Sequence, residues 1–230
     1  RYILAKLRTT VERVTATMDA YDLAGACSEI RAFLDALNNW YIRRSRARFW
    51  RGELDQDKKD AYDTLYTVLT TLCKLAAPFL PFVTEEVYRG LTGEKSVHLV
   101  DWPEAAKLPA DAELVRNMDR VREVCSTALG LREEKRLRVR MPLALLVVAG
   151  DWHDALKPFK ELIASEVNVR KVEFSPNEQD FARITVTVNA KQAGPRLGSR
   201  LKAVLPAVKD RKWGMDGPVL VVSTNEGEER

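Results

Sequence analysis

Apolar residues recur at helical spacing through the first 93 residues. Leu4, Leu7, Val11 and Val14 follow one another at three- or four-residue intervals, which predicts a helix buried along one face. The same spacing predicts further helices over about 22–50, 62–76 and 84–93, the last two separated by prolines. Because such helices must cover one another's apolar faces, we expect an antiparallel helix bundle and a mainly α fold.

The pattern changes further along the chain. A proline-marked connector over 94–110 precedes another predicted helix over 111–136. Short apolar or alternating runs then predict strands over 143–148, 169–174, 184–188 and 219–222, with helices over 153–166 and 201–208. We therefore expect two domains, a helical one over 1–140 that includes the connector and a small α+β domain over 141–230.

Composition limits the classes of protein to which this chain can belong. Hydrophobic residues make up 46% of the 230 residues, enough for buried cores, and the net charge is +4. No apolar run approaches the length of a membrane span, so we expect a soluble, cytoplasmic protein. The chain starts without methionine and already in a helical pattern, which suggests a piece of a longer protein.

The cysteines and histidines do not form a metal-binding motif. Cys27, Cys73 and Cys125 are widely spaced, and His98 and His153 are isolated, so we expect no metal site. Each cysteine lies in a helical pattern and is expected to be reduced and buried. No motif for a nucleophile, a phosphate-binding glycine loop or acid–base catalysis is present, and we expect no catalytic residue in this chain.

The segment 38–50 carries the strongest functional signal. It holds four arginines and four aromatic residues without an acid, a composition typical of RNA-binding surfaces. On a regular helix, Arg44 and Arg48 continue the buried stripe while Arg43 and Arg46 turn away from it. Arg43 and Arg46 are therefore the best candidates for RNA contacts, and Arg44 and Arg48 are weaker ones because buried acids would also pair with them.

The aromatic residue at the end of this segment has two interpretations. Trp50 is either a platform on which an RNA base stacks or a side chain that fills the core of the bundle. The arginines likewise have an alternative role as solvated side chains at an exposed helix end.

Two further basic sets are candidates for RNA contacts. Arg136, Arg138 and Arg140 alternate with apolar residues, so an extended segment would place them on one face; a charged sheet edge is the alternative. Arg196 lies between Gly194 and Gly198, which serve either for close approach of RNA to the backbone or as turn residues.

Four stretches resemble one enzyme family in the same order along the chain. Residues 39–50 read NWYIRRSRARFW and resemble a signature of the anticodon-binding helical domain of the isoleucyl-tRNA synthetases, which are class I enzymes. The later stretches are LAAPFLPFVTEE at 75–86, SVHLVDWP at 96–103 and GPRLG at 194–198. The second of the four is shared with valyl and leucyl relatives.

The resemblance implies a function and a partner. It implies that the chain is the C-terminal, anticodon-binding part of a ligase that attaches isoleucine to its tRNA. The expected partner is tRNA for isoleucine, and binding to DNA or to a membrane is not expected. ATP and magnesium would serve the parent enzyme, expected to be a monomer, and no cofactor would bind this part. In methionyl relatives an anticodon contact lies near the position of Trp50. The alternatives are the same region of a valyl enzyme and a free-standing helical RNA-binding or scaffold module.

Overall fold

The computed structural model describes residues 1–150, 152–177, 181, 186–210, 212–216, 219–224 and 227–229. These residues are mainly helical, with a few short strands. The chain divides into two compact units, Arg1–Ser175 and Pro176–Arg230. The division falls after Ser175, whereas the sequence predicts a boundary after residue 140, because the first two strands share a core with the helices.

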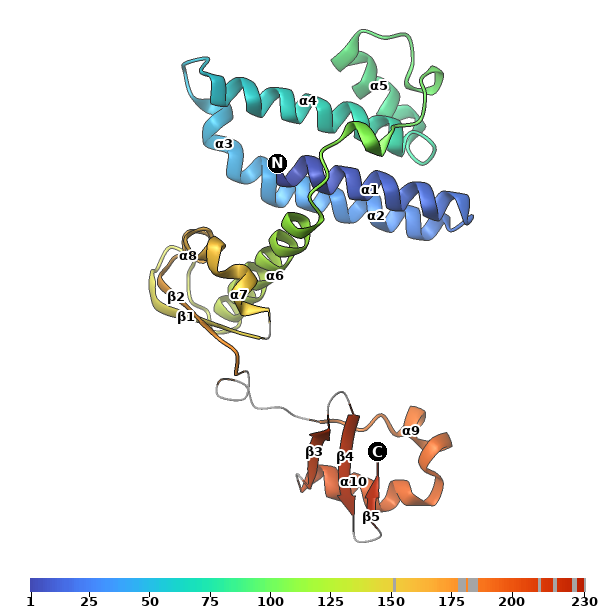
Figure 1. Cartoon of the computed structure of the whole chain (residues 1–230), viewed down its shortest axis with the longest axis vertical. Helices are drawn as coiled ribbons and strands as arrows, with labels where there is room; N and C mark the ends of the chain where they lie inside the picture. The colour runs from blue at the N-terminus through green and yellow to red at the C-terminus, as the bar shows by residue number, and fades with distance from the viewer. Residues whose placement is uncertain are drawn as a thin grey trace. The chain divides into compact units, whose positions relative to one another are not determined.

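Helices form most of the first unit (Figure 1). Aspartates precede three of them as N-caps, where Asp22, Asp55 and Asp111 accept hydrogen bonds from backbone N–H groups of the first turn. The helices are α1 (Tyr2–Asp19), α2 (Leu23–Asp35), α3 (Arg43–Trp50), α4 (Gln56–Ala76), α5 (Pro81–Thr92) and α6 (Ala112–Glu134). Helix α5 begins at Pro81, three residues before the predicted start, because proline has the backbone angle that the first helical position needs.

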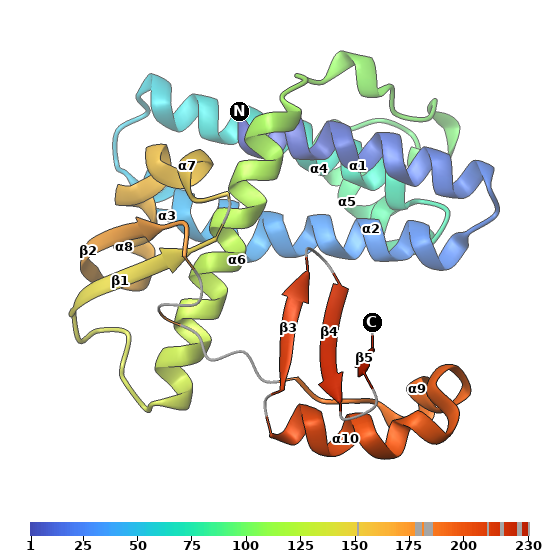
Figure 2. The ribbon, with the colours of Figure 1, turned by 60° about the horizontal axis from the view of Figure 1, so that its bottom comes forward.

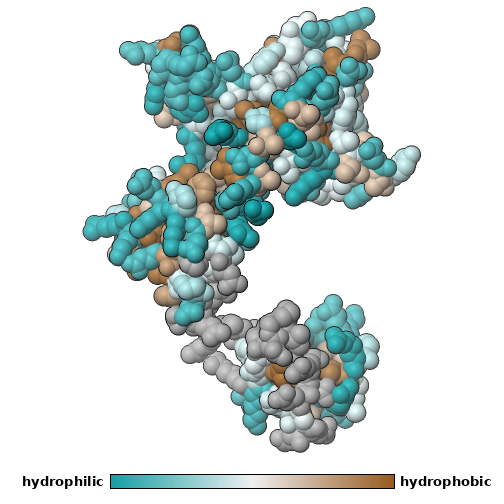
Figure 3. Space-filling view, viewed as in Figure 1, coloured by the Kyte–Doolittle hydropathy of each residue, from teal (hydrophilic) through white to brown (hydrophobic). Residues whose placement is uncertain are grey.

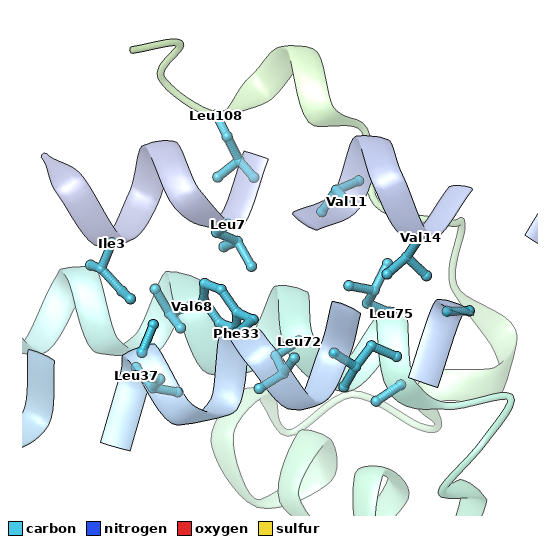
Figure 4. Packing of buried hydrophobic residues seen from close by; sticks show 14 residues of the cluster. Ile3, Leu7, Val11, Val14, Phe33, Leu37, Val68, Leu72, Leu75 and Leu108 are labelled. Carbon is cyan, nitrogen blue, oxygen red and sulfur yellow. The ribbon is translucent and has the colours of Figure 1, made fainter. Parts of the chain in front are cut away.

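One hydrophobic core joins α1, α2 and α4. Leu7, Val11 and Val14 of the predicted stripe are fully buried. Leu4 is only partly buried, and the neighbouring Ile3 is buried in its stead. Figure 4 shows Ile3, Leu7 and Val14 of α1 directed toward Phe33 and Leu37 and toward residues of α4. The facing residues are Phe33, Leu37, Val68, Leu72 and Leu75.

The long helix predicted over 22–50 contains an irregular turn. Residues Ala36–Ile42 form a π-helical turn between α2 and α3. Leu37 packs into the core with α1 and α4, whereas Trp40 packs into a second core with Met118 and Val121 of α6. The π-helical turn thus lies where the helix passes from one core to the next, and it shifts the phase of every side chain that follows.

The connector after α5 packs along the helices. It contains 3₁₀ turns at Val97–Leu99 and Ala105–Lys107. The Glu85 carboxylate accepts hydrogen bonds from the Val97 N–H and the Ser96 hydroxyl, which lower its pKa. The indole N–H of Trp102 donates to Thr15 on α1 at 2.9 Å.

A β-α-β arrangement covers α6. Strand β1 (Leu143–Ala149) pairs in parallel with β2 (Val169–Ser175), with Leu143 opposite Val169. Between them lie α7 (His153–Leu156), a 3₁₀ turn (Lys157–Phe159) and α8 (Lys160–Val167). The single helix predicted over 153–166 is thus divided, at the 3₁₀ turn that contains Pro158. Ile163 and Val167 of α8 pack into the second core with Val121 of α6.

The second unit has its own sheet and core. Strand β4 (Val219–Thr224) lies between the antiparallel strands β3 (Trp213–Asp216) and β5 (Gly227–Glu229). Figure 2 shows α10 (Leu201–Lys209) beside these strands, with α9 (Ala190–Leu197) preceding it. Val204 and Val208 of α10 pack against Val222 of β4.

One predicted strand of the second unit lies partly outside the described residues. Residues 184 and 185 of the strand predicted over 184–188 lie outside the described residues. The remaining three have no strand assignment, although Val186 and Val188 pack against the core of the unit.

Candidate nucleic-acid interface

Two arginines at the start of α3 share one carboxylate. Glu166 on α8 accepts from the guanidinium groups of Arg43 and of Arg44, the latter at 2.5 Å. The Glu166 side chain is only 6% exposed. Arg44 also lies over the ring of Trp40, 5.3 Å from its centroid. These two cations are therefore held in place rather than free in solvent.

The other end of α3 presents an aromatic ring to solvent. Trp50 is 76% exposed, so its interpretation as a core side chain is wrong. The guanidinium of Arg46, one helical turn earlier, lies 5.1 Å from the centroid of the Trp50 ring. Arg46 is exposed and has no acidic partner in the part of the chain that the structure describes. The pair forms an exposed cationic and aromatic surface, here called the Arg46–Trp50 platform.

An acidic residue of the next helix, α4, neutralises the charge of Arg48. Its guanidinium pairs with the Asp57 carboxylate at 2.8 Å, and this hydrogen-bonded pairing raises the pKa of Arg48. Arg48 thus pairs with an acid, which is the alternative to an RNA contact, although Asp57 is half-exposed rather than buried. Figure 3 shows hydrophilic residues gathered over the turn between α3 and α4.

The π-helical turn explains where the regular projection fails. On a regular helix over 22–50, Arg43 would point away from the core and Arg44 toward it. In the structure both side chains reach Glu166. Each residue of a regular α-helix advances by 100°, and the wider π-helical turn breaks that step before Arg43.

The second basic set lies in a turn, here called the arginine turn (residues 135–141). The predicted extended segment is wrong, because α6 ends at Glu134, Arg136 follows with a left-handed φ of 56°, and the Met141 N–H bonds to the Arg138 carbonyl. Arg136, Arg138 and Arg140 are all exposed there.

A buried arginine holds this turn. Arg132, in the last turn of α6, is 3% exposed. Its Nη2 donates to the carbonyl oxygens of Arg138 at 2.6 Å and Val139 at 3.3 Å, and also to that of Met141. Its Nε and Nη1 have no partner among the described residues.

Two neighbouring cavities along α6 lie between these two basic regions. A cavity of about 460 Å³ is lined by residues that include Arg43, Arg122 and Glu166, and one of about 670 Å³ by residues that include Arg132 and Arg138. Both cavities are lined by Ser126 and Leu129, so they adjoin one another. The start of α3 and the arginine turn thus border two adjoining cavities, here together called the α6 groove.

Two groove residues make long-range contacts that no local sequence pattern indicates. Glu166 meets arginines more than 120 residues away, and nothing in the spacing of α8 indicates that contact. Arg122 bonds to Asp35 at 2.6 Å and to Asp119 at 3.3 Å, which ties α6 to the end of α2. Only the Asp119–Arg122 spacing, three residues on a helix, was visible in the sequence.

Arg196 belongs to the second unit. It is exposed on α9 and lines a cavity of about 300 Å³ with Asn189 and Gln192. Gly198 has a left-handed φ of 53° directly after the helix, which supports its role as a turn residue.

Cysteine burial differs from expectation at one position. Cys73 and Cys125 are buried, and burial raises the pKa of Cys125 to about 12, whereas Cys27 is exposed. Among the described residues, no three histidine, cysteine or acidic side chains converge as metal ligands. Nor does any helix of the described part have the length and apolar character needed to cross a bilayer.

Comparison with known proteins gives a consistent family. The chain is 52% identical to the isoleucine–tRNA ligase of Nocardia farcinica over 93% of its own length and 20% of that protein. It is 51% identical to that of Mycobacterium tuberculosis over 96% of its length and 21% of the relative, and 49% identical to that of Corynebacterium efficiens over 99% and 22%. The chain thus spans about a fifth of the length of these relatives. Residues 1–147 match the family model described as the anticodon-binding domain of tRNA ligase. The chain therefore belongs to the family of tRNA-ligase anticodon-binding domains.

Proposed function

We propose that this chain is the C-terminal, anticodon-binding part of an isoleucine–tRNA ligase and that it binds tRNA for isoleucine. The single observation that carries the proposal is the exposed Arg46–Trp50 platform on the basic helix α3. The names of the relatives, all isoleucine–tRNA ligases, support the choice of amino acid. The proposal includes the finer expectation that the helices form the antiparallel bundle of class I synthetases.

The chemistry of the ligase is assigned to the rest of the enzyme. In this proposal ATP, magnesium and isoleucine bind elsewhere in a monomeric, cytoplasmic enzyme, and this part positions the tRNA. Contacts made here, far from the reacting groups, help to align the acceptor end of the tRNA for transfer.

The two kinds of surface suit different parts of an RNA loop. An exposed indole ring offers a flat face to an unstacked base, and the neighbouring Arg46 adds a cation for a phosphate or for the same base. The α6 groove offers guanidinium groups from α3 and from the arginine turn to the adjoining backbone.

Binding to altered tRNA tests the proposal. The 230-residue chain is expected to bind tRNA for isoleucine at least about tenfold more tightly than the same tRNA with changed anticodon bases, as the loss of one stacked base would produce. The chain alone is expected to give no isoleucine-dependent pyrophosphate exchange. Equal affinity for the two tRNAs in a filter-binding titration would contradict anticodon recognition.

Replacing Arg46 with alanine is expected to weaken tRNA binding mainly through charge. The plot of log affinity against log salt should become shallower by roughly 0.7–0.9, the value for one lost phosphate contact. Arg48→Ala is the matched control on the same helix, because Asp57 already neutralises Arg48. An Arg46 variant whose salt slope equals that of the unchanged chain would show that Arg46 does not contact phosphate.

A further inference from the structure

Glu166 occupies an unusual position for a carboxylate beside an RNA-binding helix. Its side chain is 6% exposed, whereas those of its partners Arg43 and Arg44 are 52% and 30% exposed. One nearly buried anion thus lies beneath two cations that reach the surface. The three groups together carry one net positive charge.

Each of the two arginines is fixed at a second point. The Nε of Arg43 donates to the Asn39 carbonyl at 2.8 Å, within the π-helical turn. The guanidinium of Arg44 lies against the ring of Trp40, which is itself buried. Neither cation is therefore free to follow a mobile ligand, and each presents its remaining N–H donors in a defined direction.

The carboxylate is held as firmly as its partners. Glu166 lies between Ile163 and Val167 in sequence, and both of these are fully buried in the core that α8 shares with α6. A buried carboxylate is costly unless cations compensate it, so Glu166 and the arginines hold one another in place. Without it, two adjacent guanidinium groups would repel each other.

We propose that Glu166 is a positioning residue of the RNA-binding surface, resting on the function proposed above. Its carboxylate sets the guanidinium groups of Arg43 and Arg44 side by side and offsets one of their charges. The pair therefore attracts RNA in general less strongly, and it accepts a phosphate through donors whose directions are already fixed. Glu166 thus lowers the affinity for polyanions in general and increases the discrimination between RNAs. The β-α-β arrangement contributes to RNA recognition through this one side chain.

The test replaces Glu166 with glutamine, which keeps the shape and removes the charge. For single-stranded poly(U), Glu166→Gln is expected to tighten binding and to steepen the salt slope by roughly 0.7, as one unmasked cation would. The ratio of affinities for the unchanged and the anticodon-altered tRNA is expected to fall at least about threefold. Glu161→Gln is the matched control, because Glu161 is an exposed acid on the same helix.

Two further variants separate positioning from stability. Glu166→Asp keeps the charge but shortens the side chain. The salt slope of poly(U) binding should therefore stay unchanged, while the ratio of affinities for the unchanged and the anticodon-altered tRNA falls. In a chain that carries Arg43→Ala and Arg44→Ala, adding Glu166→Gln should leave the poly(U) slope unchanged. Melting curves identify the folded fraction of each variant.

The outcomes distinguish this inference from the proposed function. Equal poly(U) slopes for the Glu166→Gln and Glu161→Gln chains would overturn the role of Glu166. If the unchanged chain does not discriminate between the two tRNAs, the proposed function fails, and the poly(U) slopes still decide whether Glu166 masks a cation.

Discussion

Replacing Arg132 with alanine is expected to lower the free energy of unfolding of the first unit by about 2–4 kcal/mol. The buried guanidinium donates to carbonyl groups of Arg138, Val139 and Met141, and its removal takes one donor from each of them and leaves a gap beside α6. Urea denaturation measures the loss. The same variant should bind tRNA less tightly, because the arginine turn no longer has a fixed shape.

Arg140→Ala is the control for this prediction. Arg140 is exposed in the same turn, so its replacement should change the free energy of unfolding by no more than about 0.5 kcal/mol. If the Arg132 and Arg140 variants unfold at the same urea concentration, the buried guanidinium does not stabilise the turn.

Replacing Trp50 with alanine is expected to weaken tRNA binding by roughly 1–3 kcal/mol, the value for one base that loses its stacking partner. The salt slope should change little, because the indole carries no charge. The melting temperature should also change little, since Trp50 is 76% exposed. The loss of binding should be smaller for a tRNA with an altered anticodon, whose base would not be placed on the ring.

A second exposed aromatic residue provides the comparison for Trp50. Phe82 is 87% exposed on α5, and Figure 1 shows α5 and α3 at opposite ends of α4, so Phe82→Ala should leave tRNA binding unchanged. A Trp50 variant that melts earlier yet binds normally when folded would rule out the stacking role.

Local patterns in the sequence predict the helices well because burial repeats with the helical period. Leu7, Val11 and Val14 face the core as their spacing requires, and the aspartate caps agree with it. The strand over 143–148 is predicted in the right place from its apolar run, but only Val148 in it is buried, so it is not the covered strand that the run predicts.

Long-range contacts explain what the sequence does not show. The direction of the α3 arginines depends on a π-helical turn that arises where Leu37 and Trp40 enter different cores. The boundary between the two units lies after Ser175 rather than after residue 140 because β1 and β2 pack on α6, a contact that no local pattern encodes. Likewise, the partnership of Glu166 with α3 exists only after the chain has folded.

The π-helical turn at Ala36–Ile42 also affects how this surface can change over evolutionary time. Such a turn is equivalent to an α-helix that has gained one amino acid. Losing a single codon within it would restore the regular helix and leave the side chains of α3 near their present directions, because the wider turn spreads one extra residue over the same rotation. In an uninterrupted helix, by contrast, each residue gained or lost rotates the following side chains by about 100°. The direction of Arg46 and Trp50 is thus compatible with both lengths of this segment.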